Sequence, residues 1–278
     1  MLKLAGFADE ISPDLDEQIR VCRELGITHL ELRSVNKINV LDFDAPLRSQ
    51  IRDKLRAAGL GVASIGSPIG KVKIDGPWPD HFDRFKIGVE LAEFFGAPLL
   101  RIFSYYPPQK DQDIRLHRDE VLRRMVAKVK YVQNYPVTLV HENEAAIYGD
   151  HGKECLDLMR SINSPKLRSA FDFANFIMCG EHPLDNWKLL KPYTVHIHVK
   201  DAVLKDRTIV PAGEGDGQIE EILVDAYRSG YREFVSLEPH LARHGNMGGF
   251  SGPELFKMAA DALKRICRKN NIPLGAAS

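Results

Sequence analysis

The sequence lacks the marks of a secreted or membrane-spanning protein. Its four cysteines are scattered through 278 residues without a CxxC pair, which is typical of reduced thiols in a cytosolic protein. No stretch approaches the ~20 apolar residues that a membrane span needs. The first residues, MLKLAGFADEISPD, become acidic too early for a signal peptide. We therefore expect a cytoplasmic protein without a membrane partner.

An excess of charge of one sign is also missing. Lysine plus arginine and aspartate plus glutamate number 38 each, so the formal net charge is zero. Nucleic-acid binders normally carry a basic excess, so we expect no nucleic-acid partner. The chain has no GxGxxG after its first expected strand and no GxxxxGK[ST], which counts against a nucleotide-binding open sheet.

What the chain does contain is a regular alternation of strand-like and helix-like segments, in eight units of about 35 residues. The expected strands are 3–8, 28–32, 61–65, 98–103, 137–142, 167–172, 194–201 and 234–238. The expected helices are 15–25, 46–58, 80–95, 113–133, 153–162, 184–190, 219–229 and 254–268. Eight units favour an α/β fold, a single-domain (β/α)8 TIM barrel over residues 1–269 with a partly frayed tail, 270–278. An open doubly wound sheet is the alternative.

Glycines end several of the expected helices immediately before the next strand, in the segments ELGIT, AAGLG, FFGAP and SGYRE. Glycine accepts the left-handed conformation of a helix C-cap, so the strand can begin within two residues. Repeated short connections of this kind imply parallel strands joined by right-handed helical crossovers.

The last four expected strands each end in a side chain suited to a metal ion. These residues are Glu142, Asp172, His198 and Glu238, spaced 30, 26 and 40 residues apart. The C-terminal ends of barrel strands face the active-site mouth, so a barrel would make these side chains neighbours. Two Glu, one Asp and one His suit a divalent cation. Asp172 could instead cap a helix, but the expected helix at 184–190 begins too far downstream.

Other polar residues near the strand ends are candidates for contact with a substrate or a ligand. His196 lies deeper in its strand than His198 and is expected to be a core histidine. Asp201 would fix an imidazole or a lysine behind the ligands. The candidate substrate contacts are Arg33, Arg101, Glu144, Asn175, Lys200 and His240. For the two arginines, an ordinary ion pair at the rim is the competing interpretation. Lys200 could be a surface lysine, and His240 could simply be exposed to solvent.

Five segments follow one another in the order HEN (141–143), FDFAN (171–175), HIHVKD (196–201), GEGDGQI and GYREFVSLEPH. In this order they resemble the xylose isomerase-like TIM barrels, a family of sugar and sugar phosphate isomerases and epimerases. The resemblance covers most of the chain. It implies one divalent metal ion, Mn²⁺, Mg²⁺, Co²⁺ or Zn²⁺, on the four strand-end ligands. It also implies that Glu142 and Glu238 are the catalytic acid and base, which move a proton through a metal-bound enediolate.

The expected substrate is a small carbohydrate, and the resemblance leaves several reactions open. The related epimerases often have a histidine three residues after the aspartate, where this chain has Asn175. A metal-dependent dehydratase or lyase acting on a keto-sugar or keto-inositol is therefore the first alternative. An endonuclease IV-like phosphodiesterase is a more remote one, because it would need more histidines at the early strand ends. A non-catalytic sugar- or metal-binding barrel is a third, and a homo-oligomer is left open.

Overall fold

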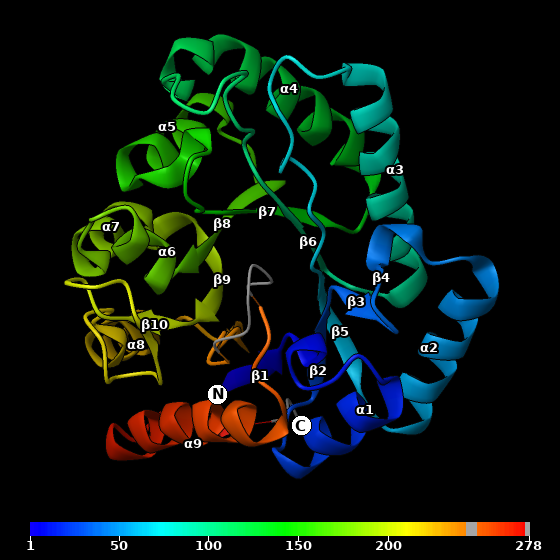
Figure 1. Ribbon diagram of the computed structural model, residues 1–278, viewed down its shortest axis with the longest axis vertical. Coiled ribbons are helices and arrows are strands. Elements are labelled where there is room, and N and C mark those ends of the chain that lie inside the picture. The colour runs from blue at the N-terminus through cyan, green and yellow to red at the C-terminus, as the bar shows by residue number, and fades with distance from the viewer. Residues whose placement is uncertain (243–248, 276–278) are drawn as a thin grey trace.

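Eight parallel strands form a closed ring in the computed structural model, which describes residues 1–242 and 249–275 (Figure 1). They are β1 Leu2–Gly6, β2 His29–Leu32, β5 Gly61–Ile65, β6 Leu99–Ile102, β7 Thr138–Glu142, β8 Leu167–Asp172, β9 Thr194–Val199 and β12 Phe234–Leu237. Each strand pairs with the next, and β12 pairs back onto β1, so the ring has no free edge. This arrangement confirms the predicted (β/α)8 TIM barrel and excludes the open sheet.

The helices lie outside the ring and cover it, as Figure 1 shows. They are α1 Leu15–Glu24, α2 Ala45–Ala57, α3 Trp78–Phe95, α4 Arg118–Tyr131, α5 Gly152–Ile162, α6 Phe173–Met178, α7 Pro183–Leu190, α8 Ile219–Arg228 and α9 Pro253–Lys269. The expected helix at 113–133 begins instead with a 3-10 turn, Ile114–His117. Gly96 ends α3 with φ of 65°, so the left-handed C-cap expected from FFGAP is present.

Short strands outside the eight-stranded ring form two antiparallel pairs. β3 Ser34–Val35 pairs with β4 Ile38–Asn39, and β10 Asp201–Ala202 pairs with β11 Ile209–Val210. The expected strand 194–201 is therefore two strands, because β9 ends at Val199. Within the tail 270–278, β13 Leu274–Gly275 pairs with β1, and its partial fraying stays a prediction. Residues 276–278 lie outside the described residues. Among the residues that the structure describes, no helix is long and apolar enough to cross a membrane.

An apolar layer fills the barrel interior on the N-terminal side of the strand ends. Ala5, Ala63, Val140, Ala170 and Phe234 are buried and form one cluster there. Because successive side chains of a strand alternate between its faces, the residue two positions further along points inward as well. The strands β7 and β8 therefore place their last residues, two beyond this layer, inside the C-terminal mouth of the barrel.

Candidate active site

The four side chains predicted as metal ligands meet at the C-terminal mouth of the barrel. Glu142 and Asp172 end β7 and β8, His198 lies in β9, and Glu238 follows β12. The strand register pairs Asp172 with His198. One ligand atom from each of the four residues lies within 4.8 Å of the others, and all four residues are buried. The barrel thus brings together residues that span almost 100 positions of the chain.

Two buried cations neutralise part of the negative charge of this quartet. Lys200 Nζ lies 2.9 Å from Asp172 Oδ2 and 3.2 Å from Glu238 Oε2. Arg101 Nη1 lies 2.9 Å from Glu142 Oε2 and 3.5 Å from Glu238 Oε1. Arg33 Nη1 also lies 3.3 Å from Glu238 Oε1, but Arg33 is shared with Asp9 at 2.7 Å. A divalent ion would therefore meet carboxylates whose charge these cations balance only in part.

The surroundings give the three carboxyl groups different pKa values. Burial alone would raise the pKa of Glu142, but the charges of Arg101 and His198 outweigh it and bring that pKa to about 2. The pKa of Glu238 is also well below its usual value, because Lys200 outweighs burial there. Burial raises the pKa of Asp172 to about 7, and Lys200 opposes this only in part. At neutral pH both glutamates are therefore ionised.

The quartet fits a divalent metal ion by its chemistry and by an unsatisfied atom. Three carboxylates and one imidazole are ligands that Mg²⁺, Mn²⁺, Co²⁺ and Zn²⁺ accept. Both ring nitrogens of His198 are buried and have no hydrogen-bond partner among the described residues, and Nδ1 is the one that faces the glutamates of the quartet. Nδ1 lies 3.4 Å from Glu142 Oε1 and 3.6 Å from Glu238 Oε2. A ring nitrogen placed between two carboxylates in this way is suited to share a cation with them once it is deprotonated.

A cavity of about 300 Å³ opens beside the quartet. Its lining includes five of the six predicted substrate contacts, namely Arg33, Arg101, Glu144, Lys200 and His240. The two predicted acid–base residues line it as well. A larger hollow of about 700 Å³ lies at the opposite, N-terminal end of the barrel and holds none of the candidate residues. We therefore place the candidate active site at the smaller cavity.

Asn175, the sixth predicted substrate contact, is hydrogen-bonded to one of the predicted metal ligands. It lies on α6, and its Nδ2 donates to Glu142 Oε1 at 3.1 Å and to the Asn143 carbonyl at 2.9 Å. These hydrogen bonds orient the Glu142 carboxylate. A contact between Asn175 and a substrate stays a prediction.

Asp172 caps a helix, contrary to the expectation based on the distant helix at 184–190. The short helix α6 begins directly after β8, and Asp172 Oδ1 accepts a hydrogen bond from the backbone N–H of Asn175 at 2.8 Å. Only one carboxylate oxygen is used in this way, and Oδ2 faces Lys200. Asp172 therefore caps a helix and also contributes to the quartet.

Asp201 does not fix an imidazole or a lysine as expected. Its two carboxylate oxygens accept hydrogen bonds from the backbone N–H groups of Gly213, Gly215 and Gly217, at 2.8, 3.1 and 2.9 Å. A Cβ at Gly215 or Gly217 would lie 2.5 Å from an Asp201 oxygen. These glycines of the segment AGEGDG, residues 212–217, are thus needed for the loop to wrap around this carboxylate.

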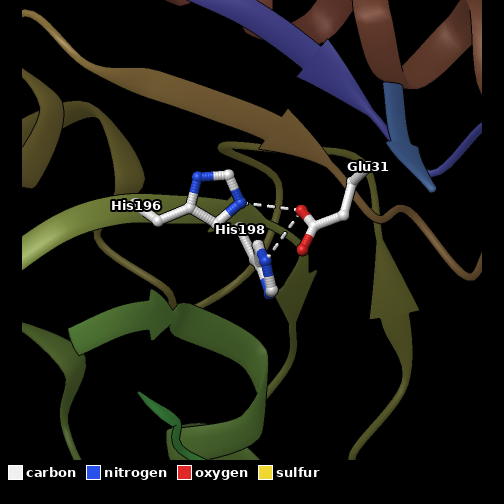
Figure 2. A group of neighbouring side chains, drawn as sticks. All are labelled: Glu31, His196 and His198. Carbon is white, nitrogen blue, oxygen red and sulfur yellow. Dashed lines mark hydrogen bonds and ion pairs between the residues drawn. The ribbon is translucent and has the colours of Figure 1, made fainter. Parts of the chain in front are cut away.

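Sequence reasoning missed Glu31 and Lys71. Glu31 lies in the middle of β2, is fully buried and contacts His196 and His198 (Figure 2). His196 is thus a buried histidine with a partner, as expected. A charged residue between two leucines of a strand, in HLEL, was the signal available for Glu31. Lys71, which lines the cavity and pairs with Glu144 at 2.6 Å, lies in a loop without such a signal.

The chain matches the family described as xylose isomerase-like TIM barrel over residues 19–266. It therefore belongs to this family, as its motifs predict.

A curated relative is the uncharacterized protein YihM of Escherichia coli, which is 27% identical over 203 residues. That match covers 67% of this chain and 56% of YihM, so it spans little more than half of the relative.

Two solved structures have the same fold at low sequence identity. The probable 3-DHS dehydratase AsbF of Bacillus anthracis superimposes with a TM-score of 0.74 and 17% identity, covering 95% of this chain and 99% of AsbF. The 3-keto-D-glucoside 4-epimerase YcjR of E. coli superimposes with a TM-score of 0.71 and 12% identity, covering 96% of this chain and all of YcjR. Identities this low establish the fold alone, so the reaction must be argued from the site.

Proposed function

We propose that the protein is a divalent-metal-dependent enzyme that moves the α-proton of a keto-sugar, as an isomerase or epimerase. The observation that carries this proposal is the convergence of two ionised glutamates, Asp172 and His198 around one point beside a polar cavity. The family to which the chain belongs supports it.

A divalent ion held by Glu142, Asp172, His198 and Glu238 would polarise a substrate carbonyl as a Lewis acid. The protein's own residues would then move the proton. Glu142 is ionised and can accept the α-proton. Its low pKa makes it a weak base, so the transfer depends on the acidity that the polarised carbonyl gives to the α-proton. Glu238 lines the same cavity and is ionised as well, so it would first take up a proton from the solvent. It could then deliver that proton to the same carbon or to its neighbour, while the proton on Glu142 returns to the solvent.

The cations of the site would stabilise the negative charge that develops on the substrate oxygens. Arg101 and Lys200 are buried, line the cavity and already contact the two glutamates. Fixed positive groups in a buried site stabilise such charge without reorganising at the moment of reaction. Arg33 Nη1, 3.3 Å from Glu238 Oε1, keeps that glutamate oriented.

A deuterium-exchange screen tests this proposal. Ketoses, their phosphates, inososes and keto-glycosides would be incubated with the protein and Mn²⁺ in deuterated water, and deuterium at the α-carbon measured by NMR. We expect exchange with at least one of these substrates. Loss of a β-hydroxyl in the product would identify a dehydratase instead of an isomerase or epimerase.

Two substitutions test the roles of the glutamates. Glu142→Gln and Glu238→Gln should each slow exchange by ~10² or more, because general acid–base catalysis contributes ~10²–10⁴. Glu154→Gln is a matched control, since Glu154 is also buried and pairs with an arginine, Arg115, at 2.8 Å, away from the site. Full exchange by the Glu142 variant would remove this residue from the mechanism.

A further inference from the structure

Glu31 connects two buried histidines through a single oxygen atom, as Figure 2 shows. Its Oε2 lies 2.7 Å from His196 Nε2 and 3.1 Å from His198 Nε2. All three side chains have essentially no exposed surface. They come from β2 and β9, which are not neighbours in the ring, so the contact crosses the barrel interior.

The His198 ring therefore spans the distance between Glu31 and the quartet. Its Nε2 faces Glu31, while its Nδ1 faces Glu142 and Glu238 at 3.4 and 3.6 Å. The ring of Phe7 packs edge-on against it at 5.3 Å, and His196 packs edge-on at 4.9 Å. These contacts leave the ring little room to turn over and exchange its two nitrogens.

A neutral imidazole carries one proton, on either of its nitrogens, and only the other nitrogen can bind a metal ion. An ionised carboxylate accepts hydrogen bonds but cannot donate one. Glu31 therefore favours the proton on the nitrogen that faces it, Nε2, and leaves the lone pair on Nδ1. A carboxylate behind a metal-binding histidine also raises the basicity of that histidine.

We propose that Glu31 is a positioning residue that holds His198 in the Nε2–H tautomer and so makes Nδ1 the metal-binding atom. This inference rests on the metal site of the proposed function. His196 supports the arrangement, because it contacts the same oxygen and keeps the Glu31 carboxylate from turning away. A carboxylate buried across the barrel from β9, with its Oε1 unpaired among the described residues, is costly, and this role accounts for that cost.

The test measures zinc affinity and the tautomer of His198 without requiring a substrate. Zn²⁺ is used because it is diamagnetic, and its dissociation constant is measured by calorimetry for the native protein, Glu31→Gln and Glu31→Leu. We expect Glu31→Leu to bind Zn²⁺ ~10–100-fold more weakly, the usual effect of removing such a partner. Glu31→Gln should lose less, because its amide oxygen can still accept the Nε2 proton.

Long-range ¹H–¹⁵N NMR of the zinc-loaded proteins gives the second readout, with the His198 signals assigned from a His198→Asn variant. The native protein should show a protonated Nε2 and a coordinated Nδ1. Glu31→Leu should show a mixture of tautomers or coordination through Nε2. A merely structural role of Glu31 would lower stability without changing which nitrogen is coordinated.

His141→Asn is the matched control. His141 is also buried in a barrel strand and also has a partner, Ser104 Oγ at 2.9 Å, but it does not contact Glu31 or His198. This variant should lose stability while keeping the native zinc affinity within about twofold.

The inference is overturned if native His198 binds zinc through Nε2, or if Glu31→Leu keeps both the native affinity and the native tautomer. If Glu31→Leu does not fold, Glu31→Ala, which also removes the acceptor, is measured in its place and decides in the same way. A protein that shows the expected tautomer change but exchanges no α-proton would refute the proposed reaction and leave the role of Glu31 intact.

Discussion

Replacing Lys200 by methionine should destabilise the protein mainly when no metal ion is bound. Lys200 is 5% exposed and contacts Asp172 and Glu238 at 2.9 and 3.2 Å. Methionine keeps most of the side-chain volume but removes the charge. Three carboxylates would then share the charge of Arg101 and part of the charge of Arg33, which also pairs with Asp9. A divalent ion in the quartet would supply the missing positive charge, so the metal-bound variant should recover much of the loss.

The magnitude follows from the burial of this ion pair. Removing one partner of a buried pair costs ~3–5 kcal/mol, because it leaves an uncompensated buried charge. The lower end applies here, since Asp172 has a pKa of about 7 and can take up a proton when Lys200 is absent. A loss of ~3 kcal/mol corresponds to a decrease in Tm of roughly 6–12 °C for a chain of this size.

Thermal unfolding with and without Mn²⁺ measures both effects. Lys188→Met is the control, because Lys188 forms an exposed pair with Asp185 at 2.8 Å, with 65% of its side chain exposed. Surface pairs of this kind contribute ~0–1 kcal/mol, so the control should lose less than ~4 °C. Mn²⁺ should raise the Tm of Lys200→Met more than that of the native protein. A metal-free Lys200→Met protein as stable as the Lys188 control would refute this reasoning.

Three further predictions concern a glycine, a loop anchor and pH. Gly70→Ala should lower the free energy of unfolding by on the order of 3 kcal/mol, measured with denaturant. Gly70 has a φ of 98°, and a Cβ there would lie 2.0 Å from the Phe103 carbonyl oxygen. Gly26→Ala, where a Cβ would have no atom within 4 Å, should lower it by only ~1 kcal/mol. Asp201→Asn should cost ~1.5–3 kcal/mol and speed proteolysis of residues 211–217, and an unchanged digestion rate would contradict the anchoring. Burial raises the pKa of Asp172 to about 7, so Mn²⁺ must displace a proton from this carboxyl group below that pH. Calorimetry should therefore show the affinity for Mn²⁺ rising by up to about tenfold per pH unit from about pH 5 to 7. A constant affinity across this range would contradict that pKa.

The barrel could be predicted because its signals are local and repeated. Alternating apolar strands and amphipathic helices need only a window of the sequence, and glycines such as Gly96 mark where each helix ends. The convergence of Glu142, Asp172, His198 and Glu238 then follows from the barrel itself, because all strand ends of a closed parallel ring point to one mouth.

Contacts that depend on exact loop paths could not be predicted. Asp172 caps α6, a six-residue helix too short to show a helical period in the sequence. Asp201 binds loop amides 12 to 16 residues further along the chain, and the glycines there indicate a loop without showing which carboxylate it binds. Glu31 meets His198 across the barrel, at a separation that only the closed ring determines.

Anomalous X-ray diffraction from crystals grown with Mn²⁺ would show whether the four side chains hold one metal ion. We expect one strong anomalous peak per chain, within bonding distance of Glu142, Asp172, Glu238 and His198 Nδ1. A peak at another place, two or more ions in the mouth of the barrel, or no peak at a saturating Mn²⁺ concentration would contradict this expectation.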